Sequence, residues 1–216
     1  KVEELNQMKM KFYTTISHEL RTPLTMIISP LEQLIQQKEK TDIEKSHQFI
    51  LRNARKLHSM INQLLDFRKH ESNEVNLQLK KMDFIEFSKE VVLSFQSLAQ
   101  RKNIQLSLES TIEKLYMAFD EDQIEKMYNN LLSNSLKYTP GNGKIKILMH
   151  LIASNKINII IEDDGVGINP KDIDHIFDRF YRSDKSRAKV AGHGLGLCIV
   201  KEICDAYKIK IKIKSA

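Results

Sequence analysis

Residues 16–24 read Ile-Ser-His-Glu-Leu-Arg-Thr-Pro-Leu, a stretch at the centre of a long amphipathic pattern. Apolar residues recur at steps of three and four across 12–34, which predicts one helix with a single apolar stripe. A polar patch at 36–42 interrupts the pattern, and a second apolar stripe follows at 43–64. Two long helices joined by a short polar turn predict an antiparallel hairpin.

Both apolar stripes are close to heptad spacing. One hairpin alone would leave much of that apolar surface in water, whereas a second copy would cover it. The sequence therefore predicts a homodimer that forms a four-helix bundle.

His18 belongs to a polar stripe on the first helix. At 100° per residue, five polar residues fall within about 40° of it: Lys11, Thr14, Thr22, Thr25 and Ser29. The ring is therefore expected on the solvent side of the helix. A neutral imidazole facing its target is a good nucleophile, although a lone histidine can also be an ordinary surface residue.

The neighbours of His18 favour the chemical interpretation. Glu19 can accept a proton from the ring or orient it, and Thr22, one turn on, can hold a water. Pro23 clashes with the carbonyl group of Glu19, so the helix either bends close to His18 or carries a tolerated kink.

The composition changes near residue 72, where glycine-free helical patterns are followed by a mixture of helix and strand patterns. Helices are predicted at 84–101, 120–138, with Asp120 as N-cap, and 197–207. Strands are predicted at 76–81, at 104–108 and 115–119 as a pair, and at 144–152 and 156–162 around a turn at 153–155. This pattern indicates an α/β sandwich.

The 216 residues are 41% hydrophobic and 29% charged, so the chain can bury a core in one or two domains. The net charge is +6, yet acids and bases are mixed and no basic stripe carries interleaved aromatic residues. This argues against direct nucleic-acid binding by this part of the protein. Cys198 and Cys204 lack metal-ligand or disulfide-framework spacing, which favours a reducing compartment.

No apolar run approaches the roughly 18 residues that span a membrane, and no signal peptide is present. The first residue is not Met and the opening is already helical. We expect a piece of a longer protein.

Three stretches of the second half together predict a nucleotide site. Asn130 and Asn134 share a helix face, where amide oxygens suit Mg²⁺, and Lys137 can meet phosphate charge. The alternative is an exposed polar face at a helix end. In Asp163-Asp164-Gly165-Val166-Gly167, a carboxylate can accept the exocyclic amine of adenine, or the stretch is a simple turn.

The third stretch is Gly192-His193-Gly194-Leu195-Gly196-Leu197, before an apolar helical run. Glycines before a helix N-terminus can build an anion cradle from backbone N–H groups. A dinucleotide fingerprint is excluded because no parallel strand feeds the stretch and no βαβ unit follows. The polar, basic segment 183–190 is either a mobile lid or an ordinary surface loop.

Five motifs in order, "SHELRTPL", "NNLLSNSLKYTP", "DDGVG", "IFDRFYR" and "GHGLGL", resemble the H, N, first glycine, F and second glycine boxes of sensor histidine kinases. The resemblance implies a dimerisation and histidine phosphotransfer hairpin at 1–72, which forms a dimeric four-helix bundle. A Bergerat-type ATP-binding domain would follow at 76–216. The first motif is also similar to that of hybrid sensor kinases.

The resemblance implies roles for individual residues. His18 would be the phosphoacceptor, Glu19 its general base, and Thr22 would assist dephosphorylation of the partner regulator. Asn134 would be the Mg²⁺ ligand, and Asp163 would read adenine. The other nucleotide-site residues that it implies are Asn130, Lys137, Tyr138, Gly165, Gly167, Arg182 near the γ-phosphate, Gly192, Gly194 and Gly196.

The implied function is ATP-dependent autophosphorylation of His18, followed by transfer to an aspartate of a response-regulator receiver domain. The chain would be the cytoplasmic portion of a membrane-bound sensor. One alternative is a gyrase- or MutL-type ATPase clamp. Such sites place a glutamate one turn before the magnesium asparagine, where this chain has Asn130, which cannot act as a base. A second alternative is a degenerate kinase that serves only as a scaffold.

Two departures from the family pattern stand out. A Gly-Gly turn usually follows the last helix, whereas this chain has Asp-Ala-Tyr-Lys-Ile at 205–209. The sequence also stops at Ala216, before the final strand usual in such domains, so we expect a weakened sheet edge.

Overall fold

The computed structural model describes residues 2–36, 43–71, 77–153, 156–179, 181–183 and 194–215. Most of the polar turn expected at 36–42, most of the turn at 153–155, most of the segment 183–190, and Gly192 lie outside the described residues. The chain forms two compact units: one contains the helical hairpin, within 1–75, together with the short segment 191–195, and the other is an α/β unit within 76–190 and 196–216. None of the described helices combines the length and apolar character that a membrane crossing requires.

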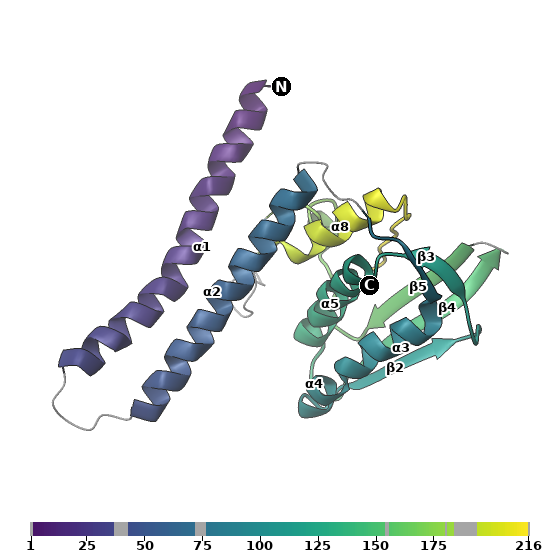
Figure 1. Cartoon of the computed structure of the whole chain (residues 1–216), viewed down its shortest axis with the longest axis horizontal. Helices are drawn as coiled ribbons and strands as arrows, with labels where there is room; N and C mark the ends of the chain where they lie inside the picture. Colours follow the sequence, from purple (N-terminus) through teal and green to yellow (C-terminus); the bar gives the residue numbers. More distant parts are fainter. Residues whose placement is uncertain are drawn as a thin grey trace. The chain divides into compact units, whose positions relative to one another are not determined.

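The first unit confirms the predicted hairpin. Helix α1 spans Val2–Gln36 and α2 spans Ile43–Glu71, and Figure 1 shows them as two long antiparallel rods. Pro23 and Pro30 lie inside α1 without ending it. A proline leaves the carbonyl four residues earlier without its helical hydrogen bond. That carbonyl belongs to Glu19 for Pro23 and to Met26 for Pro30.

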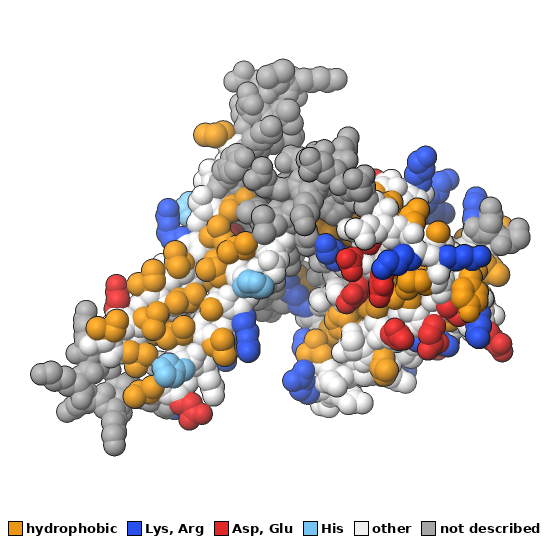
Figure 2. All heavy atoms as spheres, viewed as in Figure 1, with side chains coloured by type: hydrophobic (Ala, Val, Ile, Leu, Met, Phe, Trp, Pro, Cys, Tyr) orange, Lys and Arg blue, Asp and Glu red, His pale blue; other side chains and the backbone are white. Residues whose placement is uncertain are grey.

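Much of the apolar surface of the hairpin is exposed, and Figure 2 shows hydrophobic side chains gathered along it. The exposed large apolar residues are Met10, Leu24, Met26, Ile28, Leu31, Ile35, Ile43, Phe49, Leu51 and Ile61. Apolar patches of this extent are unusual on a soluble monomer and mark an interaction surface.

Where the structure describes it, the second unit contains several helices and two small sheets. Its helices are α3 Phe84–Ser94, α4 Gln96–Arg101, α5 Glu121–Tyr138, α6 Pro170–Ile173 and α8 Gly196–Ala206. Its strands are β1 Lys80–Asp83, β2 Gln105–Ser110, β3 Tyr116–Phe119, β4 Lys144–Ala153 and β5 Lys156–Asp163. The larger sheet has the order β2-β4-β5, with β2 parallel and β5 antiparallel to β4, while β1 and β3 form a separate antiparallel pair.

The core of this unit lies between the larger sheet and its helices. Alternate residues of β4 point inward and are fully buried, including Ile145 and Ile147. They meet a layer in which α5 contacts both α3 and α8 (Figure 1). The hydroxyl group of the buried Tyr128 donates to Ser88 Oγ at 3.0 Å, and burial raises the pKa of Tyr128 to about 12. The phenol therefore remains a donor at neutral pH.

Three element predictions were wrong in detail. The predicted strands at 104–108 and 115–119 exist, but β2 pairs with β4 and β3 pairs with β1. The predicted helix 84–101 is broken at Phe95, whose N–H group bonds back to Val92 and Leu93. The strand expected at 76–81 is displaced to Lys80–Asp83, where its register is set by pairing with β3.

The structure confirms Asp120 as the N-cap of α5, and Asp120 also bonds to two other segments. Its Oδ1 accepts from Gln123 N at 3.1 Å, and its Oδ2 accepts from Gln78 N at 2.8 Å. The hydroxyl group of Tyr207, just beyond α8, contacts Asp120 N at 2.7 Å. One buried residue thus fastens the start of α5 to the entry segment and to the end of α8, and so fixes the two helices that frame the candidate site.

The turn after α8 forms without a Gly-Gly pair. Lys208 has φ 56°, the left-handed conformation that usually falls to glycine at a helix end. Ile209 N donates to Cys204 O at 2.7 Å, the bond of a Schellman motif. The turn is therefore kept, with a lysine at the strained position.

Replacing Lys208 with glycine should relieve this strain. The left-handed conformation costs a non-glycine residue about 1–2 kcal/mol, and the greater freedom of glycine in the unfolded chain offsets part of the gain. We expect Lys208→Gly to raise the free energy of unfolding by about 0.5–1 kcal/mol in urea denaturation. Lys210→Gly, at an exposed position without positive φ, should not stabilise. Equal effects of the two changes would contradict the explanation.

Candidate functional site

His18 lies in the middle of α1 with an exposed side chain, as the helical wheel predicts. Glu19 is half-buried, and Thr22 is exposed. The hydroxyl group of Thr22 donates to the carbonyl oxygen of His18 at 3.2 Å, so it is bound to the backbone one turn before it. Pro23 is buried. The imidazole is thus presented to solvent by a long helix, at the turn where proline removes one backbone hydrogen bond.

In the second unit, α5, the end of β5 and the start of α8 converge. The amide nitrogen of Asn130 donates to Lys126 O at 2.8 Å, and its amide oxygen lies close to Gly196 at the start of α8. A Cβ atom on Gly196 would lie 2.7 Å from that oxygen. With a glycine as its first residue, α8 therefore approaches Asn130 closely, and a larger residue would require the Asn130 side chain to shift.

The carboxylate of Asp163 is held at the end of β5. Its Oδ2 accepts from Ser135 Oγ at 2.9 Å, and its Oδ1 accepts from Gly165 N at 3.0 Å. A Cβ atom on Gly165 would collide with Asp163 Oδ1 and would lie 3.4 Å from the carbonyl oxygen of Tyr138. The structure thus places Asp163 against the C-terminal part of α5, with an exposed side chain that keeps acceptor capacity.

The two adjacent aspartates have different roles in the fold. Asp164 exchanges hydrogen bonds with Lys144 across the sheet: Asp164 N donates to Lys144 O at 3.0 Å, and Asp164 Oδ2 accepts from Lys144 N at 2.9 Å. It therefore closes the end of the β4–β5 pair. Gly167 follows with φ 68°, a conformation that side chains rarely adopt, which fits a sharp turn after the strand.

The remaining predicted residues of this unit are placed as follows. Asn134 is half-buried on α5, one turn after Asn130. Lys137, also half-buried, has its ammonium group 4.8 Å from the ring centroid of Tyr138, a cation–π contact. Gly194 has φ 70°, and Gly196 begins α8. The glycine spacing thus ends at a helix N-terminus, as expected.

The segment that contains Arg182 is a set of turns tied together by side chains. Tyr181 donates its hydroxyl hydrogen to Asp172 Oδ1 at 2.7 Å, and His175 Nδ1 lies 2.8 Å from Asp178 Oδ2. Arg179 Nη2 lies 3.8 Å from Glu202 Oε1, which links the segment to α8. Arg182 itself is half-buried at the end of this folded stretch.

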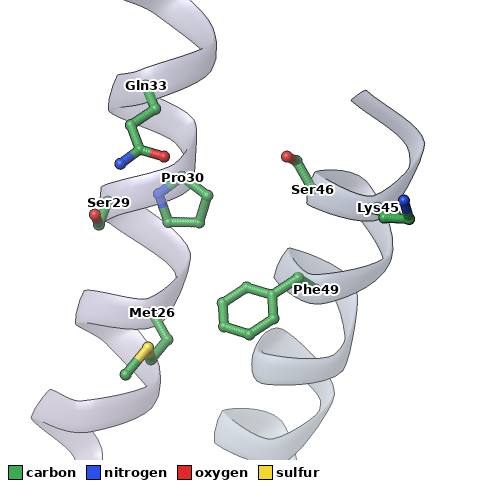
Figure 3. Close-up of a pocket in the computed structure, with 7 residues that line it drawn as sticks. All are labelled: Met26, Ser29, Pro30, Gln33, Lys45, Ser46 and Phe49. Carbon is green, nitrogen blue, oxygen red and sulfur yellow. The ribbon is translucent and has the colours of Figure 1, made fainter. Parts of the chain in front are cut away.

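Two other features do not suit nucleotide chemistry. A groove of about 400 Å³ lies between α1 and α2, lined by Met26, Ser29, Pro30, Gln33, Lys45, Ser46 and Phe49 (Figure 3). It offers no glycine or carboxylate. The two cysteines are buried and free, and burial, the largest cause, raises the pKa of Cys198 to about 12 and that of Cys204 to about 11. Both thiols are therefore protonated and unreactive at neutral pH.

Sequence reasoning missed Ser135. This serine is 6% exposed and lies among the inward positions of α5, three residues after the buried Leu132 and seven after Tyr128. The signal was present: a hydroxyl group at a core-facing helix position needs a hydrogen-bond partner. What the pattern could not supply was the identity of that partner, 28 residues away in sequence.

Two family descriptions match the chain in succession. Residues 8–73 match the His Kinase A (phospho-acceptor) domain. Residues 119–216 match the histidine kinase-, DNA gyrase B-, and HSP90-like ATPases. The first match contains His18, and the second contains α5, β5 and α8.

Curated relatives align over nearly the whole chain. Histidine kinase P4 of Formosa agariphila is 37% identical over 98% of this chain and 16% of its own length. Sensor histidine kinase WalK of Bacillus subtilis is 32% identical over 95% of this chain and 34% of its own length. The chain thus spans well under two thirds of these relatives.

Solved structures share the fold. Histidine kinase AdeS of Acinetobacter baumannii superposes with a TM-score of 0.71 at 26% identity, over 88% of this chain and 86% of its own. Histidine kinase ThkA in complex with response regulator protein TrrA superposes with a TM-score of 0.68 at 22% identity, over 84% of this chain and 53% of that one, a likeness of fold.

The regions that match the two family descriptions follow one another in the same order as the motifs found in the sequence. The chain belongs to the sensor histidine kinases.

Proposed function

We propose that this protein phosphorylates itself on His18 with ATP. The observation that carries the proposal is that one chain holds both an exposed imidazole, on α1, and a site where the Asp163 carboxylate and the glycine at the start of α8 lie against α5. Each part alone has a simpler interpretation. Together, in a chain of this family, they supply a nucleophile and a site for the phosphoryl donor.

The proposed reaction is an in-line displacement. An imidazole nitrogen of His18 attacks the terminal phosphorus of ATP, a P–N bond forms, and the P–O bond to ADP breaks. The proton of the other ring nitrogen passes to Glu19, which follows directly in the sequence. Positioning of the two reactants and electrostatic stabilisation supply most of the acceleration, as in other phosphoryl transfers.

Residues of the α/β unit would hold the nucleotide. Asp163, backed by Gly165 and Gly167, would accept the exocyclic amine of adenine. The site also includes Asn130, Lys137 and Tyr138 of the α5 region, Arg182 near the γ-phosphate, and Gly192, Gly194 and Gly196 at the phosphates. Asn134 offers an amide oxygen suited to Mg²⁺, an ion that neutralises phosphate charge when bound.

The phosphoryl group would next pass to an aspartate of a response-regulator receiver domain. The P–N bond of phosphohistidine breaks and an acyl phosphate forms on the aspartate. Support comes from the fold shared with ThkA, a kinase solved in complex with the response regulator TrrA. In the opposing reaction, water attacks the acyl phosphate of the regulator and releases inorganic phosphate, and Thr22, one helical turn from His18, would assist this dephosphorylation.

The hairpin would form a homodimer as a four-helix bundle. Residues 1–72 would be the dimerisation and phosphotransfer domain, and 76–216 the catalytic ATP-binding domain. The exposed apolar residues on both helices support this assignment. So does the groove in Figure 3, where Pro30 and Phe49 face one another across the helices and leave apolar surface to be filled.

This part of the protein would lie on the cytoplasmic side of a membrane-bound sensor. ATP is a cytoplasmic metabolite, and two free cysteines suit a reducing compartment. No nucleic acid is expected to bind it directly, because its charges of opposite sign are mixed along the chain.

Labelling with γ-labelled ATP and Mg²⁺ tests the function. We expect one label per chain, lost in acid and kept in alkali as a phosphoramidate is, and recovered on the peptide that contains His18. Release of inorganic phosphate without label on the protein would favour a gyrase- or MutL-type clamp. Absence of nucleotide binding by calorimetry would favour a scaffold. Either outcome would refute the proposal.

A further inference from the structure

The hydroxyl group of Ser135 connects two elements of the candidate site. Ser135 lies on α5 and is 6% exposed, and its Oγ is 2.9 Å from Asp163 Oδ2 at the end of β5. A buried hydroxyl in contact with a carboxylate at this distance is a charge-assisted hydrogen bond when the acid is ionised. The helix therefore holds the acid from one side.

The second oxygen of Asp163 is held from the other side. Gly165 N donates to Oδ1 at 3.0 Å. With one donor on each oxygen, rotation of the carboxylate about its Cβ–Cγ bond is restricted. Each carboxylate oxygen has two lone-pair positions, so one on each oxygen is left over. The group is thus set in one orientation and can still accept hydrogen bonds from a ligand.

The direction of the hydrogen bond between Ser135 and Asp163 decides which hydrogen-bonding groups the two side chains present to a ligand. An ionised carboxylate only accepts, so the single hydroxyl hydrogen of Ser135 is directed at Asp163. The serine oxygen then has only lone pairs left for a ligand or a water. Both groups present acceptors on this side of the site, which suits an amino group and is mismatched to a carbonyl oxygen.

We propose that Ser135 is a positioning residue that makes this site prefer a 6-aminopurine to a 6-oxopurine nucleotide. It acts through Asp163, whose carboxylate it orients. The inference rests on the proposed function, because it takes Asp163 as the group that meets the purine base.

The experiment compares ATP with inosine triphosphate, in which a 6-oxo group replaces the 6-amino group. Dissociation constants are measured with Mg²⁺ for wild type, Ser135→Ala and Ser135→Thr. We expect Ser135→Ala to weaken ATP binding about tenfold, the effect of one hydrogen bond to a charged group, and to leave inosine triphosphate nearly unchanged. Ser135→Thr keeps the hydroxyl group and should retain a wild-type preference.

Ser88→Ala is the matched control. Its hydroxyl group is also buried in the second unit, where it donates to Phe84 O at 2.7 Å and accepts from Tyr128. We expect lower stability in that variant but the wild-type ratio of the two dissociation constants. The ratio is insensitive to the fraction of folded protein, so poor folding of Ser135→Ala would not obscure it.

The outcomes separate this inference from the function. Suppose that wild type binds ATP and labels His18, but Ser135→Ala keeps the wild-type ratio of dissociation constants, either because neither affinity changes or because both fall equally. Ser135 is then not a positioning residue, whereas the proposed kinase activity is unaffected. A wild type that binds both nucleotides equally also overturns the inference. If wild type binds neither nucleotide, the proposed function falls with it.

Discussion

Replacing His18 with glutamine should reduce labelling by γ-labelled ATP to background, a loss of at least about 1000-fold. Glutamine is polar and of similar size, so the exposed position on α1 tolerates it without loss of packing. Its amide nitrogen has no free lone pair to attack phosphorus. The residue removed is the nucleophile itself, which makes this the largest effect expected in the molecule.

The control is the same substitution at His47, another exposed histidine of the hairpin, on α2. His47→Gln should label like wild type. Both variants should bind ATP with the wild-type dissociation constant, because Asp163 and the residues of α5 proposed to hold the nucleotide lie in the other unit. Persistent labelling of His18→Gln, or equal loss in both variants, would remove His18 as the acceptor.

Local patterns of the sequence predicted the helices well. The three- and four-residue spacing predicted α1 and α2, and an aspartate before a polar first turn predicted the start of α5. These signals lie within one or two helical turns, so no distant partner is needed to read them. The end of α8 is an exception: the absence of a Gly-Gly pair suggested an altered turn, whereas Lys208 adopts the left-handed conformation and the turn is kept.

Strand partners could not be predicted in the same way. Segment 105–110 pairs in parallel with β4, across an intervening helix, and not with the strand that follows it in sequence. Strand propensity describes a half-buried pleated surface and says nothing about which strand lies alongside. Nothing in the sequence signalled the break at Phe95 either, because no proline or glycine marks it.

In the candidate site too, local motifs could be predicted and contacts between distant residues could not. Asparagine spacing, the aspartates and the glycines were visible as motifs, since each is local. The bonds between them are not local: Ser135 reaches Asp163, and Asn130 meets Gly196. The distinction between the two aspartates also needed the sheet, because only its register shows that Asp164 closes the strand pair with Lys144.

The different roles of Asp163 and Asp164 lead to the second large expected effect, a loss of ATP binding. Asp163→Asn replaces one acceptor oxygen by an amide that donates, so either the bond from Ser135, the bond from Gly165 or the contact to adenine is lost. A donor set against the exocyclic amine is repulsive as well as unpaired. We expect ATP binding to weaken about 100-fold, in line with loss of a charged hydrogen bond and an added mismatch, and labelling of His18 to fall with it.

Asp164→Asn is the matched control, one residue along the same strand end. Its remaining carbonyl oxygen can still accept from Lys144 N, the bond that the carboxylate makes. ATP binding, measured by calorimetry, should stay within about twofold of wild type, and any change should appear as a small loss of thermal stability. If both variants lost ATP affinity equally, the strand end and not the carboxylate of Asp163 would be what the nucleotide requires. Unchanged affinity in Asp163→Asn would mean that adenine is recognised by other residues.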